Sequence, residues 1–166
     1  MSAKNKQVKK RNGRLEELNL DKINGCAERA CEGLGEVSVS EIVLDASLQL
    51  YDKIPTAEID KALILSSRSK IEKEPSYAYV AARLLLTNLY KEVFGESVDS
   101  DVFEQQYKKS FIQNVKKLVK ANRLSKELLS YDLNLLSNHI APERDKLFKY
   151  LGIQTLYDRY FIHVDQ

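Results

Sequence analysis

Three cationic side chains near the start of the chain are spaced so that they could bind a polyphosphate. Lys10 and Arg11 precede an Asn12-Gly13 pair, and Lys22 follows after a short gap. Asn-Gly is the strongest short-range signal for a β-hairpin, so the first two cations are expected beside a tight turn. We expect Lys22 in the first turn of the next helix, whose N-terminal N–H groups and dipole favour anions. The spacing therefore predicts one small anion site, although each lysine taken alone is more simply explained as a solvated surface charge.

The elements that must position these cations are a hairpin and the helices that follow it. The pattern from Gln7 to Leu20 predicts a hairpin whose edge strand ends at Leu20, and Asp21 is expected to cap the first helix. Gly33 and Gly35 are expected to end that helix. Three more helices are predicted: one capped by Ser38 in a capping-box pattern with Glu41, one capped by Thr56, and one from about Tyr77 to Phe94, closed by Gly95.

The second half of the chain is predicted to be helical as well. An apolar face from Phe103 to Val119 has lysines on its other side, and Ser125 is expected to cap one helix that continues through Leu136. Pro142 is expected in the first turn of a helix over 143–151 that Gly152 ends. We therefore predict a frayed polar tail at residues 1–6, a compact unit of a small sheet on four helices at 7–95, and the start of an all-α domain at 96–166.

Composition supports a mainly α fold and excludes several classes of protein. The chain has 166 residues, 43% hydrophobic and 30% charged, with only six Gly and three Pro. Its net charge of +2 is too small to predict binding to nucleic acid or to membranes. No apolar run approaches the roughly 18 residues that a membrane helix requires, and no signal peptide is recognisable, so we expect a cytoplasmic protein.

The two cysteines do not form a recognisable metal or disulfide pattern. Cys26 and Cys31 are five positions apart, and neither has a paired Cys or His nearby. We predict that they are small packing residues of the first helix and that the chain holds no metal site of its own. His139 and His163 are likewise interpreted as structural residues.

Several segments are similar to those of a known family. Three resemble the ATP-cone, the regulatory module at the N-terminus of many ribonucleotide reductase large subunits: V-K-K-R-N-G-R-L-E-E-L-N-L-D-K-I at 8–23, I-P-T-A-E-I at 54–59 and P-S-Y-A-Y-V-A-A-R-L-L-L at 75–86. Two more resemble the start of the helical domain of class I large subunits: L-L-S-Y-D-L-N-L-L at 128–136 and L-G-I-Q-T-L-Y-D-R-Y-F-I-H at 151–163. The resemblance covers residues 7 to 163.

The resemblance implies a binding site for ATP or dATP, with Mg²⁺ on the triphosphate. It places Lys10, Arg11, Lys22 and Lys91 on the phosphates with the hydroxyl of Thr56, places Val8, Ile23 and Ile59 around the adenine, and places Glu16 and Asn19 on the base or sugar. Simple core packing remains an alternative for the three aliphatic residues, a snorkelling side chain for Lys91 and a turn residue for Asn19. One departure is Asp60, at a position where some relatives carry a histidine beside the ribose.

The function that the resemblance implies is allosteric control of the enzyme that makes deoxyribonucleotides for DNA synthesis. ATP would activate, dATP would inhibit, and nucleotide identity would bias oligomer assembly. Cys26 and Cys31 cannot be the catalytic cysteines of that oxidoreductase, whose barrel is expected beyond residue 166, so the chain alone is expected to be inactive. The implied partners are the remainder of the large subunit, the radical-generating small subunit and, as an option, further copies of the chain, with no membrane or nucleic acid.

Three alternatives remain open at this point. The chain could be a stand-alone or split-gene ATP-cone protein that regulates a reductase in trans. It could be a nucleotide-sensing transcriptional regulator, although such regulators carry a four-cysteine zinc ribbon before the cone, which is not recognisable here. It could also be a structural helical module whose lysine-rich helix binds a partner protein or nucleic acid.

Overall fold

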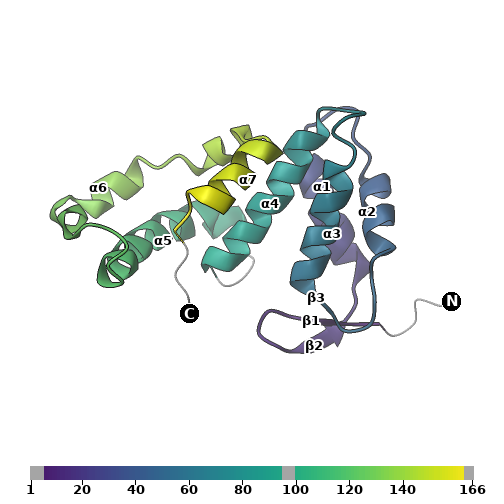
Figure 1. The fold of residues 1–166 in the computed structure, drawn as a ribbon, viewed down its shortest axis with the longest axis horizontal. Coiled ribbons are helices and arrows are strands. Elements are labelled where there is room, and N and C mark those ends of the chain that lie inside the picture. Colours follow the sequence, from purple (N-terminus) through teal and green to yellow (C-terminus); the bar gives the residue numbers. More distant parts are fainter. Residues whose placement is uncertain (1–5, 95–99, 163–166) are drawn as a thin grey trace. The chain divides into compact units, whose positions relative to one another are not determined.

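The computed structural model describes residues 6–94 and 100–162, in two compact units (Figure 1). The first unit comprises residues up to Asn88 together with Lys146–Gln154. The second comprises Leu89–Asp145 together with the residues from Thr155 onwards. The expected tail at residues 1–6, apart from Lys6, and the expected helix end at Gly95 lie outside the described residues.

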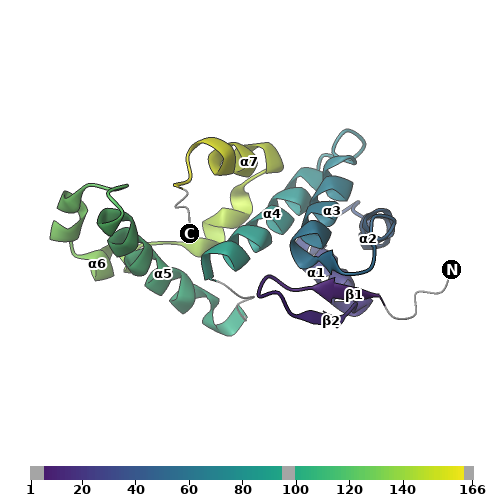
Figure 2. The same cartoon turned by 60° about the horizontal axis from the view of Figure 1, so that its bottom comes forward.

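A three-stranded sheet opens the first unit, in the order β2-β1-β3. Strands β1 (Gln7–Lys9) and β2 (Leu15–Glu17) pair antiparallel, and β3 (Ile54–Pro55) pairs parallel with β1. The predicted hairpin is confirmed, and Figure 2 shows it at one end of α1 (Leu20–Cys31) and α3 (Thr56–Arg68). Strand β3 was not predicted, because two residues are too few to give a readable alternation.

The hairpin loop has three residues rather than the two that Asn-Gly most often forms. The N–H of Gly13 donates to the carbonyl of Lys10 (2.9 Å), and the N–H of Lys10 donates to the carbonyl of Arg14 (2.8 Å). Gly13 has φ +83°, a left-handed conformation that costs glycine little. This is a turn followed by a bulge, and it leaves Arg11 at the tip of the loop.

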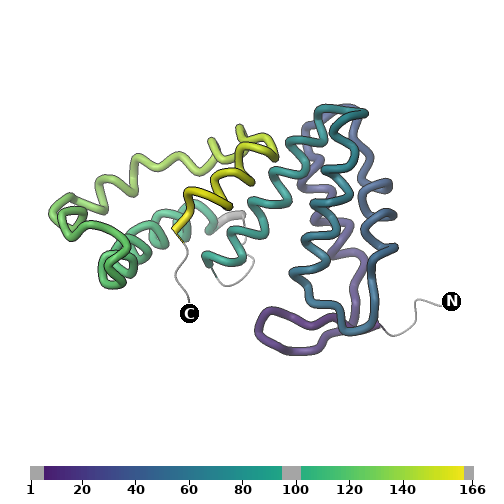
Figure 3. Tube along the Cα trace, in the orientation of Figure 1, coloured from purple at the N-terminus to yellow at the C-terminus, as the bar shows by residue number. Residues whose placement is uncertain are grey.

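Four helices complete most of the first unit. Helix α2 (Val39–Ser47) packs against both α1 and α3, and Figure 3 shows these three running side by side. Helix α4 (Tyr77–Phe94) has the predicted bounds, and its part up to Asn88, which belongs to this unit, supplies buried residues to the core. The most deeply buried apolar side chains of this unit are Ala27, Ile42, Ala46, Ile54, Ala62, Leu63, Val80, Ala81, Ala82 and Ile153. The predicted mainly α fold with a small sheet is therefore confirmed.

Two of the predicted helix starts were wrong by one or two residues. Asn19, not Asp21, caps α1, because its Oδ1 accepts the N–H groups of Asp21 (2.8 Å) and Lys22 (3.2 Å). Leu20 is consequently the first residue of α1 and not the end of an edge strand. Helix α3 is preceded by Pro55 at the cap position, so that Thr56 is already helical.

The capping and termination signals of the other helices are confirmed in part. Ser38 caps α2 as predicted, with its Oγ accepting the N–H of Glu41 (3.3 Å). In a capping box the side chain of Glu41 would accept the N–H of Ser38. Here that N–H donates to the hydroxyl of Tyr77 instead (2.9 Å). Gly33, at φ +70°, ends α1 as predicted. Arg83 of α4 caps the same helix end, since its Nη1 donates to the carbonyl of Glu32 (2.7 Å).

The second unit is built on α5 (Ser100–Lys120). Where one helix was predicted from Ser125 through Leu136, there are two: a 3₁₀ helix (Lys126–Ser130) and α6 (Leu133–Asn138). The break follows from Asp132, whose Oδ1 accepts the N–H groups of Asn134 and Leu135 (both 3.0 Å) and so starts a new helix. A small core of Val115, Val119 and Leu133 joins α5 to α6.

The predicted helix over 143–151 was also wrong. Residues Pro142–Leu147 form a 3₁₀ helix, and Gly152 lies inside α7 (Tyr150–Arg159) instead of ending a helix. Ile153 is 2% exposed, so its burial keeps this segment helical through the glycine. Among the residues that the structure describes, no helix is both long and apolar enough to cross a membrane.

Four aromatic rings pack together in the second unit, and two of them bond a carboxylate. Tyr90, Phe94, Phe103 and Tyr107 lie within 6.2 Å of one another, centroid to centroid, in every pair. The hydroxyls of Tyr90 and Tyr107 both donate to Oδ2 of Asp145, at 2.8 and 3.1 Å. Burial, and then the negative Asp145, raise the pKa of Tyr107 to about 12, and the same causes raise the pKa of Tyr90.

These two tyrosines should make the chain less stable in strong alkali. Their pKa values are higher in the folded chain than in the unfolded one, so their stabilisation is complete below about pH 10 and is lost as the pH rises through about 12. We expect the free energy of unfolding in urea, followed by circular dichroism, to fall over this window. The fall should shrink in the Y90F/Y107F variant and persist in the exposed control Y131F. An equal fall in all three chains would contradict the assignment.

Candidate functional site

The parallel pairing of β1 with β3 determines where the predicted cations lie. Val8 pairs with Ile54 and Lys9 with Pro55, so Lys10 leaves β1 where α3 begins at Thr56. No side chain caps α3, because the cap position is Pro55. The sequence predicted an anion site at the start of α1, and the register brings the Lys10-Arg11 pair to the start of α3 as well. A helix N-terminus and adjacent cations are together suited to an anion.

The start of α1 has fewer open N–H donors than that of α3, because a side chain caps α1. The N–H groups of Asp21 and Lys22 are already bonded to Oδ1 of Asn19, so they are not open donors. The side chain of Lys22 is exposed on the first turn. Asn19 thus has a structural role as a helix cap, which is close to the turn-residue alternative predicted for it. Since its Oδ1 is occupied, only its Nδ2 group would be left to contact a ligand.

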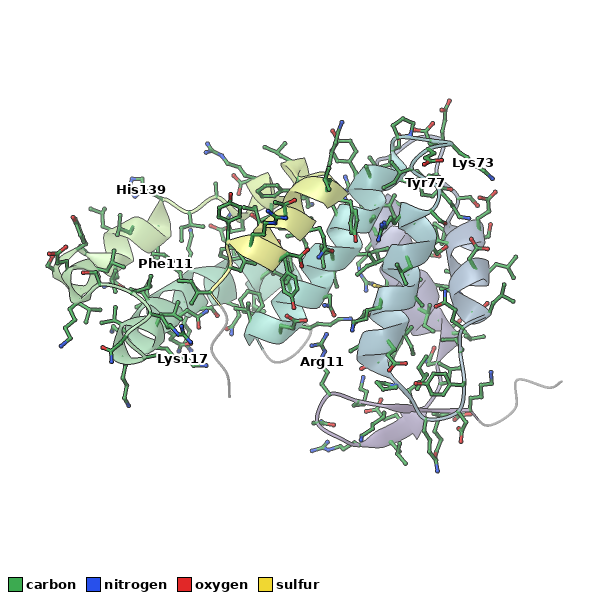
Figure 4. The ribbon with its side chains drawn as sticks, in the orientation of Figure 1. Arg11, Lys73, Tyr77, Phe111, Lys117 and His139 are labelled. Atoms are coloured by element: carbon green, nitrogen blue, oxygen red, sulfur yellow. The ribbon has the colours of Figure 1, made fainter. Side chains whose placement is uncertain are left out.

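Arg11 is held by two residues from different helices. Its Nη2 donates to Oδ1 of Asn88 on α4 at 2.6 Å and lies 3.7 Å from Oδ2 of Asp60 on α3. The side chain of Arg11 is 33% exposed and that of Asp60 only 13%. Figure 4 shows Arg11 rising from the tip of the hairpin loop. The predicted phosphate ligand therefore has protein partners in this structure.

The contact of Asn88 with Arg11 was not predicted from the sequence, and Asp60 stood out there only as a departure from the family pattern. A signal for Asn88 did exist, since it precedes Lys91 by three positions and so lies on the same helix face. It could not be recognised, because nothing local relates position 88 to the hairpin. Lys91 itself falls in the second unit, so its predicted place beside Lys10 and Arg11 stays a prediction.

Lys10 and Glu16 form an ion pair across the hairpin. Nζ of Lys10 lies 3.7 Å from Oε2 of Glu16, and the two side chains are 37% and 46% exposed. An ion pair this exposed contributes little to stability, so either side chain can exchange its partner for a ligand at low cost. Glu16 also lies opposite Val8 in the β1–β2 register.

The three aliphatic residues predicted to surround a base are part of the core. Val8, Ile23 and Ile59 are 6%, 8% and 6% exposed. This burial agrees with the core-packing alternative, and any flat ring would meet only their small exposed edges. The hairpin, α1 and α3 supply one each.

The cysteines and acidic side chains of the described residues form neither a disulfide nor a metal site. Neither Cys26 nor Cys31 forms a disulfide, and burial raises the pKa of Cys31. In residues 6–94 and 100–162, no group of three or more His, Cys, Asp or Glu side chains could hold a metal ion. The arrangement can bind an anion beside an apolar surface.

The chain is similar to one protein family and to the large subunits of several bacterial reductases. Residues 6–92 match the family model described as the ATP cone domain. The ribonucleoside-diphosphate reductase subunit alpha of Helicobacter pylori is 40% identical over 156 residues, which cover 93% of this chain and 19% of the relative. The subunit alpha of Chlamydia pneumoniae is 38% identical over 133 residues (80% and 13%), and the reductase 1 subunit alpha of Salmonella typhimurium is 33% identical over 160 residues (93% and 20%). The chain thus spans a fifth or less of the length of these relatives.

Proposed function

Since the chain belongs to the ATP-cone family, we propose that it is the part of a ribonucleoside-diphosphate reductase large subunit that binds ATP and dATP as allosteric effectors. The observation that carries the proposal is the β1–β3 register, which brings the Lys10-Arg11 pair to the uncapped start of α3. A triphosphate is an anion with the length and charge to use both features.

The triphosphate is bound by cations from separate elements. Lys10 and Arg11 come from the hairpin, Lys22 from α1 and Lys91 from α4, and the hydroxyl of Thr56 adds a donor at the start of α3. Charged donors form stronger hydrogen bonds to phosphate oxygens than neutral ones do, so these residues supply most of the affinity. Mg²⁺ comes with the nucleotide, since it is commonly held by substrate phosphates and few protein ligands, and it neutralises part of their charge.

The adenosine part is bound by apolar edges and by two polar side chains. Val8, Ile23 and Ile59 contact the faces of the adenine, while Glu16 and the Nδ2 group of Asn19 bond the base or the sugar. Glu16 gives up its ion pair with Lys10 when Lys10 turns to a phosphate, and the exposure of that pair makes the exchange inexpensive.

The binding event is regulatory and acts on a larger assembly. ATP activates and dATP inhibits by favouring different packings of this domain and so different oligomers of the reductase. The partners are the rest of the large subunit and the radical-generating small subunit, in the cytoplasm. The reduction itself takes place outside the residues of this chain.

Calorimetry on the 166-residue chain tests the proposal directly. We expect ATP and dATP to bind in the presence of Mg²⁺, and inorganic tripolyphosphate to bind more weakly, because it lacks the ring that the apolar edges contact. Absence of heat from both nucleotides at millimolar concentration would refute the function. Equal affinities for ATP and tripolyphosphate would refute the assignment of Val8, Ile23 and Ile59 to the base.

A further inference from the structure

The contacts of Arg11 tie the tip of the hairpin to two helices. The hydrogen bond to Asn88 at 2.6 Å and the ion pair with Asp60 at 3.7 Å both use the same nitrogen, Nη2. In this arrangement the guanidinium has exchanged part of its hydration for protein acceptors. A phosphate that bonds this guanidinium through Nη2, as a bidentate contact does, must therefore compete with an amide oxygen and a carboxylate.

Asp60 adds a second barrier to an anion. Its side chain is 13% exposed, so water screens its negative charge only in part. It follows Ile59, which we place at the adenine, and so it lies close to any nucleotide bound there. If Arg11 moves to a phosphate, this carboxylate loses a cationic neighbour while a further negative charge arrives.

We propose that Asp60 and Asn88 set the affinity of the site by holding Arg11 in the nucleotide-free chain, so that a triphosphate forms a bidentate contact with Arg11 only by displacing them from Nη2. The proposal rests on the proposed function, because it concerns the same site. It predicts that the two residues weaken binding, which is the opposite of what a direct ligand contact would do. We call the contacts of Arg11 with Asp60 and Asn88 the latch, and a bound nucleotide breaks them.

The size of the effect follows from the fraction of chains in which Arg11 is released. When only that fraction can bind, the apparent dissociation constant rises in inverse proportion to it. A partly exposed ion pair with one charge-assisted hydrogen bond corresponds to about a three- to tenfold difference in affinity. This is large enough to measure and small enough for millimolar nucleotide to overcome.

The test is a double-mutant cycle between Arg11 and Asp60, read by calorimetry with ATP and with tripolyphosphate. Asp60→Asn is close in shape and removes only the charge, and it should tighten binding of both ligands about three- to tenfold. Asn88→Ala, which removes the other acceptor, should also tighten binding. In chains that carry Arg11→Ala, the gain from Asp60→Asn should fall below about twofold, because no latch remains.

A matched control separates the latch from net charge. Glu72→Gln removes one negative charge from an exposed residue of the same unit, beyond the end of α3 that is remote from the hairpin. It should leave both affinities unchanged. Equal tightening by Glu72→Gln and Asp60→Asn would reduce the effect to general electrostatics and overturn the latch.

The possible failures are distinguishable. Weaker binding in Asp60→Asn would show that Asp60 contacts the ligand, and an equal gain with and without Arg11 would show that it acts by repelling the ligand; each result overturns the latch while the nucleotide site stands. If neither the original chain nor any variant binds ATP or dATP, the proposed function fails and the latch fails with it.

Discussion

Replacing both Lys10 and Arg11 by alanine should lower the affinity of the chain for ATP at least about a hundredfold. Each charge-assisted hydrogen bond to a phosphate contributes about 1.5–3 kcal/mol, so losing two costs about 3–6 kcal/mol, and each 1.4 kcal/mol is tenfold. Both side chains lie at the solvent-exposed hairpin loop, so the fold should survive. Calorimetry measures the affinity, and the far-ultraviolet circular dichroism should stay unchanged.

A variant with the same loss of charge provides the control for this result. Lys109 and Lys117 are exposed lysines of α5 in the second unit, and replacing both by alanine also removes two positive charges. ATP should bind this control as it binds the original chain. Unchanged affinity in the Lys10/Arg11 variant would refute the phosphate assignment, and equal losses in both variants would show that only net charge matters.

Truncating Ile54 to alanine should destabilise the chain by about 2–5 kcal/mol. Ile54 is 2% exposed and pairs with Val8, so the truncation leaves a cavity at the point where β3 holds β1 beside α3. Natural domains are stable by only about 5–15 kcal/mol, so this is a large share of the total. Unfolding in urea, followed by circular dichroism, measures the loss.

Leu48 is the matched aliphatic control for that variant. Its side chain is 81% exposed, so Leu48→Ala should change the free energy of unfolding by no more than about 0.5 kcal/mol. Similar values for the two variants would mean that β3 does not anchor the sheet. The site described above would then lose the register on which it depends.

Much of this fold could be predicted from local signals. The hairpin follows from Asn12-Gly13, and α4 has the predicted bounds Tyr77–Phe94 because its apolar residues repeat over five turns. The start of α1 was predicted wrongly because two polar residues competed for one cap. Asn19 and Asp21 are both good N-caps, and the backbone geometry that selects Asn19 cannot be read from the sequence.

The candidate site could be predicted only where its residues are local. Lys10 and Arg11 were found because they flank a recognisable turn, but their position at the start of α3 depends on β3, a strand of two residues. Asn88 was missed because its contact with Arg11 joins positions 77 apart. Contacts of this kind arise from packing, which hydrophobic periodicity does not specify.

The parallel pairing of β1 with β3 also has a consequence for how the chain folds. The contact of Gln7 with Asp52 spans 45 positions, so the pairing of β1 with β3 closes a long loop that contains α1 and α2 and carries the entropy cost of that closure. The proposed triphosphate site would exist only in chains in which that closure has formed. Nucleotide at a hundred times its dissociation constant would then stabilise the chain by about 2.7 kcal/mol, so the effector would also act as a folding ligand that protects the domain from proteolysis and heat.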